Sequence, residues 1–539
     1  MNVFPLDSVR DPEQTNGQLS APSRDGRVHD RVPTTSDHAH RDDFDKSEAT
    51  GLVLPLVDRL RVALHEEEVV YCQWKGHWKR RRWATGEGDI DLLVSRGSQQ
   101  RFIRVLGQLG FKQALPPPEM RIPGVLSYYG FDKDSKKFVH VHVYFQLVLG
   151  RAWETTYHLP TEEAILDSAA QGSFFRIPAP EFELIVFVLR TMLVCSLRDF
   201  VLPHRAVSFR ASQQEFDYLE GQVDRDKLYA VLERHLPCID PALFERCVRS
   251  LRPDSGKWQR WAIGYQLRHC LKVHAQRPPL TRIITRLGRQ LLHVATAGRV
   301  PLPPSRMRFA TGGAIIAITG GDGAGKSTCV EKIHRWLAEE FDVIPIHLGK
   351  PPRSLTTLII GAPRKIARWL RGLIHGQQTG DALVPDRCPR GFLGYLDLLR
   401  EVCTARDRYR LYVKARRLAR GGSLVICDRY PLPQLKKMDG HLVAQLVAPG
   451  SGNRALASLR KAETWYYRRI LPPDLLIVLR VHPEIAARRK TNEDSDYVRE
   501  RSREIWELDW RQTKAYVVDA TSPIGEVCSC LQSLIWAKL

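Results

Sequence analysis

The sequence contains no apolar run that approaches the ~18 residues needed to cross a bilayer, and no basic segment followed by an apolar stretch opens it. Its eleven cysteines are scattered, with no C-x-x-C pair and no cluster of cysteine and histidine at metal-ligand spacing. No segment is repeated along the chain. These absences argue against a membrane span, a secretory signal, a disulfide framework and a repeat architecture. We therefore expect a soluble, cytoplasmic protein in a reducing compartment.

Acidic residues are outnumbered by basic ones, 60 against 81, which gives a net charge of +21. Such an excess indicates an anionic partner: nucleotide phosphates, a nucleic acid or an acidic membrane surface. A solvated basic surface without a specific partner is the alternative, and composition does not rank these readings. No stretch interleaves aromatic and basic residues as a stacking platform for nucleic acid would.

Shifts in composition divide the 539 residues into four segments, and the overall fold class is α/β. Residues 1–50 are polar without apolar periodicity, which predicts a disordered leader. Residues 51–180 predict a small α/β domain, and residues 181–305 predict a helical connector that ends in a linker from Val300 to Pro304. In residues 306–539 strands and helices alternate, which predicts a parallel sheet covered on both faces. Its expected strands are 314–319, 343–347, 423–427, 475–481 and 515–518.

A glycine-rich turn joins the first of these strands to a helix. Its sequence, Gly-Gly-Asp-Gly-Ala-Gly-Lys-Ser, satisfies G-x-x-x-x-G-K-[ST] in full. Glycines let backbone N–H groups wrap a phosphate, and the helix adds its positive dipole end. We expect Lys326 to reach the β- and γ-phosphates of ATP and the Ser327 hydroxyl to bind Mg²⁺. The expected ATP-contacting residues are Gly320, Gly321, Asp322, Gly323, Ala324, Gly325, Lys326, Ser327 and Thr328. A chance glycine turn is the alternative, which the flanking pattern disfavours.

Two further charged elements follow. Asp428 stands at the carboxyl end of a buried strand, where ligands of doubly wound sheets gather, so it is expected beside the phosphate loop and its Mg²⁺. Its neighbour Arg429 is expected to face phosphate. The cationic segment with Arg488, Arg489 and Lys490 is followed after an acidic loop by Arg499 and Arg501. It is expected to form a lid that screens the transferred phosphoryl group. A solvated Asp-Arg pair and an ordinary basic surface helix are the respective alternatives.

From Ala314 to Leu539 the chain resembles the thymidylate kinase family of nucleoside monophosphate kinases. The resemblance rests on the order of the following elements: Asp322 within the phosphate loop, Lys350-Pro351-Pro352, Asp428-Arg429-Tyr430, Pro473-Asp474-Leu475, Arg488-Arg489-Lys490 and Val518-Asp519-Ala520. It implies that Asp322 contacts the acceptor sugar, Arg429 the acceptor phosphate, and the loop near Asp519 the adenine of ATP.

The chain departs from that family after Tyr430. A helix that lines the base pocket is expected there, whereas this sequence continues Pro431-Leu432-Pro433-Gln434-Leu435, and two prolines break a helix start. The acceptor pocket is therefore rebuilt.

The first domain resembles the nucleotidyltransferases more weakly. Lys75-Gly76-His77 precedes Asp89-Ile90-Asp91, whose two carboxylates lie on one face of a strand and could hold a divalent metal. His77 replaces the usual serine, and the run from Val139 to Val143 stands where a third carboxylate is expected. Active nucleotidyl transfer and a structural remnant of that fold both remain open.

We expect an ATP- and Mg²⁺-dependent kinase that phosphorylates a nucleoside monophosphate or another phosphorylated small molecule, with a homodimer as a possible assembly. Two alternatives remain. One is an ATP-switched regulatory protein that binds nucleic acid, with an affinity that falls steeply with salt. The other is a bifunctional kinase and nucleotidyltransferase acting on a sugar phosphate.

Overall fold

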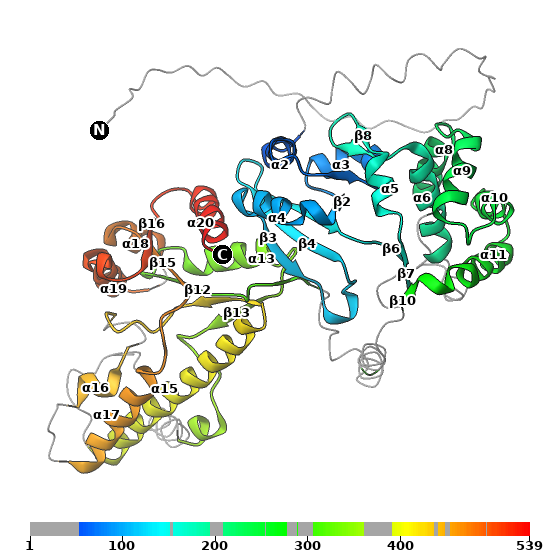
Figure 1. Ribbon diagram of the computed structural model, residues 1–539. Helices are drawn as coiled ribbons and strands as arrows, with labels where there is room; N and C mark the ends of the chain where they lie inside the picture. The colour runs from blue at the N-terminus through cyan, green and yellow to red at the C-terminus, as the bar shows by residue number, and fades with distance from the viewer. Residues whose placement is uncertain are drawn as a thin grey trace, which may run out of the picture. The chain divides into compact units, whose positions relative to one another are not determined.

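The computed structural model describes residues 53–150, 155–194, 209–253, 255–276, 288, 306–360, 391–435, 440–447, 453–491 and 493–539 (Figure 1). The predicted leader, 1–50, and the predicted linker, Val300 to Pro304, lie outside these residues. No helix in these ranges combines the length and the hydropathy that a bilayer-crossing segment requires.

The first domain is built on a mixed sheet in the order β1-β2-β5-β4-β3-β11. Only β2 and β5 run parallel, and the other neighbours are antiparallel. The last strand of this sheet, β11 (Arg308–Phe309), is contributed by residues far along the chain. The remaining elements are α2 (Pro55–Glu66), β1 (Tyr71–Gln73), η1 (His77–Lys79), α3 (Arg80–Ala84), β2 (Ile90–Val94), η2 (Arg96–Ser98), α4 (Gln99–Gln108), β3 (Lys112–Leu115), η3 (Pro118–Met120), β4 (Val125–Asp132) and β5 (Lys137–Tyr144).

Strand β5 shows how the sequence positions this sheet. In the run Val-His-Val-His-Val the three valines are buried in the core with α2 and α4, while His140 and His142 lie on the opposite face. Side chains alternate between the faces of a strand, so the pattern of period two fixes the register. This register places both histidines beside β2.

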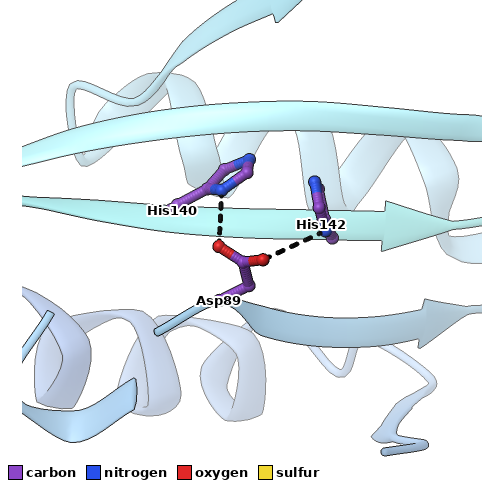
Figure 2. A group of neighbouring side chains, drawn as sticks. All are labelled: Asp89, His140 and His142. Carbon is purple, nitrogen blue, oxygen red and sulfur yellow. Dashed lines mark hydrogen bonds and ion pairs between the residues drawn. The ribbon is translucent and has the colours of Figure 1, made fainter. Parts of the chain in front are cut away.

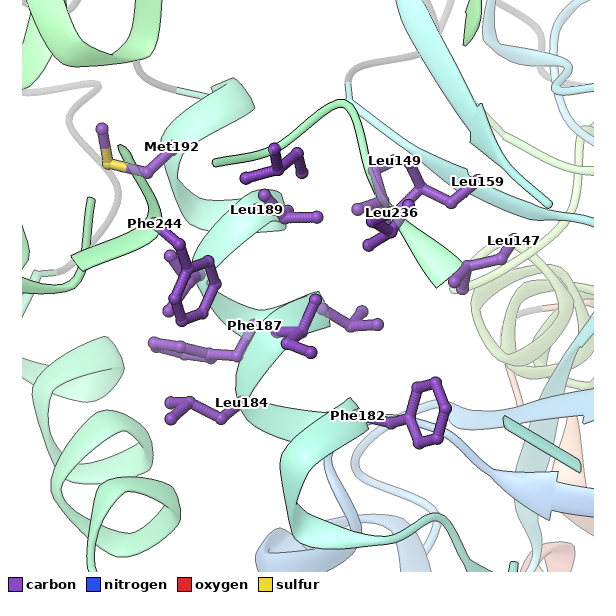
Figure 3. Close-up of a cluster of buried hydrophobic side chains, with 14 of the residues drawn as sticks. Leu147, Leu149, Leu159, Phe182, Leu184, Phe187, Leu189, Met192, Leu236 and Phe244 are labelled. Atoms are coloured by element: carbon purple, nitrogen blue, oxygen red, sulfur yellow. The ribbon is translucent and has the colours of Figure 1, made fainter. Parts of the chain in front are cut away.

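The helical part packs around α6 (Pro180–Val194), which is buried on nearly all sides. Figure 3 shows Phe182, Leu184, Phe187, Leu189 and Met192 along this helix, among leucines from β6 and β7 and Phe244 of α10. A helix that is apolar all round is stable only inside a core, which explains why apolar residues occur on every face of this segment. The surrounding elements are β6 (Leu147–Leu149), β7 (Thr156–Leu159), α5 (Glu162–Asp167), β8 (Ala170–Gln171), β9 (Arg176–Ile177), α8 (Phe209–Glu220), α9 (Arg225–His235), α10 (Pro241–Ser250), α11 (Lys257–Cys270), η5 (Leu271–His274) and β10 (Ala275–Gln276).

The C-terminal part contains a five-stranded sheet in the order β13-β14-β12-β15-β16, and all its pairs are parallel. The predicted α/β class and parallel sheet are thereby confirmed. The elements are β12 (Ile315–Gly320), α13 (Lys326–Leu337), β13 (Val343–His347), α15 (Gly391–Arg420), β14 (Leu424–Asp428), α16 (Leu442–Leu446), α17 (Arg454–Tyr467), β15 (Leu475–Arg480), α18 (Pro483–Arg489), α19 (Ser495–Glu507), η6 (Trp510–Gln512), β16 (Ala515–Asp519) and α20 (Ile524–Lys538).

The central strand β12 is buried on both faces. Ile316 and Ile318 pack in one cluster with α13 and α20, whereas Ile315 and Ala317 pack in another with α15. The sequence of a parallel strand that is covered on both faces is a continuous apolar run, and the sequence of β12 is of this kind. The carboxyl end of β12 is therefore the point where the chain leaves the core and enters the glycine-rich turn.

Candidate phosphate-binding site

The glycine-rich turn occupies the carboxyl edge of the parallel sheet. It begins where β12 ends at Gly320 and runs into α13 at Lys326, with Gly325 as the residue before the helix. Gly323 and Gly325 have φ angles of +82° and +78°, a conformation that L side chains rarely adopt. The backbone N–H groups of the first turn of α13 have no partner within the helix, so this turn offers donors to an anion.

Close packing as well as backbone angle requires glycine here. A Cβ on Gly323 would lie 2.5 Å from the carbonyl oxygen of Ala486, and one on Gly320 would lie 2.7 Å from that of Leu479. Both neighbours are backbone atoms of adjacent elements and cannot rotate away. The loop is therefore held between β15 and α18.

Lys326 is buried at the start of α13 and folds back over the loop. Its Nζ donates to the carbonyl oxygen of Gly321 at 2.6 Å and lies 3.5 Å from Oδ1 of Asp322. Burial lowers the pKa of Lys326 to about 8, although Asp322 acts in the opposite direction. An ammonium group held in this place has lost most of its hydration, so it is poised to exchange the carbonyl for a phosphate oxygen.

Asp322 is the centre of a cluster of cations. It is 3% exposed, and Arg429 and Arg501 approach its two carboxylate oxygens at 3.0 and 2.8 Å. Burial alone would raise the pKa of the Asp322 carboxyl, but Lys326, Arg429 and Arg501 hold it below its ordinary value. Arg429 has a φ of +58°, a strained conformation for a residue with a side chain. Lys326, Arg429 and Arg501 place three cationic groups around the Asp322 carboxylate, so an incoming anion would meet several N–H donors here.

The predicted metal ligand Asp428 is the last residue of β14, next to the phosphate loop in the sheet. Its Cα pairs with Ile318 of β12 on one side and His347 of β13 on the other. Its Oδ1 atom is shielded from solvent and makes no hydrogen bond with the described residues. A buried carboxylate oxygen without a donor fits a ligand of a hard cation such as Mg²⁺. Ser327, the second predicted ligand, is exposed at the start of α13.

A cavity of about 660 Å³ opens beside the loop. The loop residues Gly323 to Gly325 and Thr328 line one side, and the segment from Ala520 to Ile524 lines the other. Arg489 also lines it and donates to the carbonyl oxygens of Ala520 and Thr521 at 2.7 and 2.9 Å. The volume is that of a small-molecule site.

The structure thus brings most of the predicted site residues to one edge of the sheet, although roles for them remain predictions. Arg488 is exposed at the end of α18, and Lys490 pairs with Glu493 at 2.7 Å. Residues 430–435 contain no helix, as the two prolines predict. Arg501, from α19, was expected only as one of the cations of the lid segment, and its pair with the Asp322 carboxylate was not predicted.

We expect Asp322→Asn to destabilise the protein by about 3 kcal/mol, since it removes the buried carboxylate charge that pairs with Lys326, Arg429 and Arg501. Guanidinium-induced unfolding followed by tryptophan fluorescence measures this change. Asp58→Asn is the matched control, because its pair with Arg61 is exposed and is worth at most about 1 kcal/mol. Equal shifts of the two unfolding midpoints would contradict the cluster.

The first domain carries a second group of polar side chains (Figure 2). Asp89 faces His140 and His142 from the neighbouring strand, with Nδ1 of His140 donating to its Oδ1 at 2.7 Å. Burial tends to raise the pKa of Asp89, but the hydrogen bond and charges of its neighbours lower it to about 2. Asp91, on the same face, pairs with Lys75 at 3.0 Å. His77 lies elsewhere, paired with Glu183 of α6 at 2.8 Å, so it anchors the turn to the helical part.

The arrangement of the C-terminal part is consistent with a P-loop nucleotide-binding domain: a parallel sheet whose central strand leads through a glycine-rich turn into a helix. No known family model matches the chain. The chain is 24% identical over 226 residues to the uncharacterized ATP-binding protein YghR of Escherichia coli (strain K12). That alignment covers 41% of this chain and 86% of YghR.

Two other relatives align over similar lengths. The uncharacterized ATP-binding protein YghS of the same strain is 27% identical over 237 residues, 42% of this chain and 93% of that protein. The thymidylate kinase of Symbiobacterium thermophilum is 27% identical over 231 residues, which are 41% of this chain and 91% of that kinase. The similarity is distant and covers about two-fifths of the chain.

Proposed function

We propose that the C-terminal part is an ATP- and Mg²⁺-dependent phosphotransferase whose acceptor is a nucleoside monophosphate or a similar phosphorylated small molecule. The observation that carries this proposal is the glycine-rich loop at the end of the central strand, with Lys326 folded over it and a cavity beside it. The similarity to a thymidylate kinase and to two ATP-binding proteins supports the same activity.

The donor nucleotide would occupy the loop and the cavity. Backbone N–H groups from Gly323 onward would bind the phosphates, and Lys326 would exchange its bond with Gly321 for a phosphate oxygen. The base would lie between the loop and the segment from Ala520 to Ile524, beneath Arg489. Asp428 and Ser327 would hold Mg²⁺, which supplies charge neutralisation when it is bound.

The cation cluster supports a phosphorylated acceptor. Arg429 and Arg501 reach Asp322 from two different elements and are respectively 21% and 16% exposed, so their guanidinium groups remain accessible. Planar guanidinium groups bind phosphate through paired N–H donors. Phosphoryl transfer between two anions requires such positive charge, because the charge of the transferred group spreads over its equatorial oxygens.

We expect a panel of nucleoside monophosphates and sugar phosphates, incubated with radiolabelled ATP and Mg²⁺, to give a labelled product with at least one compound. Each monophosphate is compared with its own unphosphorylated nucleoside or sugar. The phosphorylated member of the productive pair is expected to react at least about tenfold better. The unphosphorylated member lacks a hydrogen bond to a charged group, which is worth ~1.5–3 kcal/mol. If the protein neither binds ATP nor labels any acceptor, the assignment is wrong.

A further inference from the structure

The polar cluster in the first domain is separate from the phosphate loop and converges on one carboxylate. Nδ1 of His140 lies 2.7 Å from one oxygen of Asp89, and Nδ1 of His142 lies 3.8 Å from the other. One ligand atom from each of the three residues fits within 4.8 Å of the others. Ligands bound at ~2.1 Å to one ion in tetrahedral or octahedral geometry are roughly 3.0–3.4 Å apart. The separations of 2.7 and 3.8 Å lie on either side of that range.

Burial makes this set different from an exposed group of charges. His140 is 13% exposed, and its Nε2 atom is shielded from solvent without a hydrogen-bond partner among the described residues. The ring is stacked on Tyr129, with centroids 4.1 Å apart and planes 9° from parallel. The histidines are therefore oriented by the protein, whereas Asp89 is 49% exposed and leaves the cluster open to solvent.

Lys75 pairs with one of the two carboxylates, Asp91, and leaves the other, Asp89, available to bind a metal ion. Its Nζ lies 3.0 Å from Oδ1 of Asp91 and donates to the hydroxyl of Tyr144 at 3.3 Å. Asp91 is 11% exposed and already neutralised, and it also approaches Nδ1 of His142 at 3.4 Å. A pair of hard cations held by two free carboxylates does not fit this arrangement. The groups left to bind a metal are one carboxylate and two imidazoles.

We propose that Asp89, His140 and His142 bind one divalent transition-metal ion, with the pair of Asp91 and Lys75 positioning His142 beside it. Imidazole and carboxylate donors suit zinc, iron and manganese, whereas Mg²⁺ prefers oxygen ligands alone. Three protein ligands leave at least one coordination position free, and the exposed side of Asp89 places it toward solvent. The site is independent of the nucleotide activity proposed for the C-terminal part.

The test uses the full chain, stripped of metal and kept free of nucleotide. Cobalt(II) is titrated and followed by its visible absorption, and zinc(II) is then titrated by calorimetry and by displacement of cobalt. One equivalent of each is expected to bind, without the intense near-ultraviolet bands of cobalt bound to cysteine, and millimolar Mg²⁺ is not expected to compete. Absence of saturable binding, or binding with thiolate bands, would overturn the proposal.

Variants assign the ligands. Asp89→Asn and His142→Gln are each expected to lower the affinity for zinc by at least ~10–100-fold. Replacing a residue that only hydrogen-bonds to a metal ligand already causes a loss of that size. His158→Gln is the matched control, because His158 pairs with Glu162 at 2.7 Å outside the cluster, and its affinity for zinc is expected to be unchanged. Thermal unfolding without metal confirms that each variant folds.

Two outcomes would contradict this ligand set. Binding that survives both substitutions places the metal elsewhere. Binding that is lost in Asp91→Asn but kept in His142→Gln would assign the ion to the two carboxylates instead.

Discussion

Replacing Lys326 with alanine is expected to lower ATP-dependent phosphoryl transfer by at least about 10²–10³-fold, the loss typical of removing one preorganised donor to developing charge. Lys326 is 6% exposed, and its ammonium group is held over the loop by the carbonyl oxygen of Gly321. Transfer to the best acceptor of the panel measures the change, and binding of a fluorescent ATP analogue measures the accompanying loss of affinity.

Lys332→Ala is the matched control for this substitution. Lys332 belongs to the same helix, α13, but is exposed, and its removal is expected to change neither transfer nor stability measurably. The fold of Lys326→Ala is checked by its unfolding midpoint, because Asp322 keeps its pairs with Arg429 and Arg501. Transfer at the wild-type rate in Lys326→Ala would show that the loop does not carry the activity.

Replacing Gly323 with alanine is expected to cost about 1–3 kcal/mol of stability and to weaken ATP binding at least about tenfold. The new methyl group would stand 2.5 Å from the carbonyl oxygen of Ala486, and the φ of +82° is unfavourable for alanine. The loop must then move away from α18, which displaces the N–H groups that would bind phosphate. Unfolding midpoints and ATP titrations measure the two effects.

Gly525→Ala provides the comparison. Gly525 lies in the first turn of α20, and a Cβ there would meet no heavy atom within 4 Å. Alanine in a helix is favoured over glycine by ~0.5–1 kcal/mol, so this variant is expected to be as stable as the wild type or slightly more stable. If both glycine variants bind ATP equally well, the close packing of the loop is irrelevant to binding.

The C-terminal fold could be predicted because its signals are local. Each of the five expected strands of the parallel sheet is present, and Val343–His347 has the expected bounds. The position of Asp428 followed from the same logic, since the carboxyl ends of parallel strands share an edge. Strands β3 and β4 of the first domain were not predicted, because β3 is mostly half-buried and the last six residues of β4 are all buried, so neither strand alternates between buried and exposed positions.

The charged partners within the site could not be predicted in the same way. Arg501 is separated from Asp322 by 179 residues, and only the packing of α19 beside the loop selects it from the other arginines of that helix. The sequence of β5 does contain a signal for the group of Asp89, His140 and His142. His140 and His142 alternate with buried valines on a strand, which places both imidazoles on the face where a third carboxylate was expected.

The sequence by itself determined the glycine-rich loop, the hydrophobic strands around it and the lack of a helix in residues 430–435. These depend on φ angles that only glycine adopts freely, on side-chain periodicity and on the missing N–H of proline, which act within a few residues. Tertiary structure alone decided that Arg501 meets Asp322, that Lys75 neutralises Asp91 and that two histidines face Asp89. Those contacts depend on sheet register and helix packing between distant segments, which no local pattern specifies.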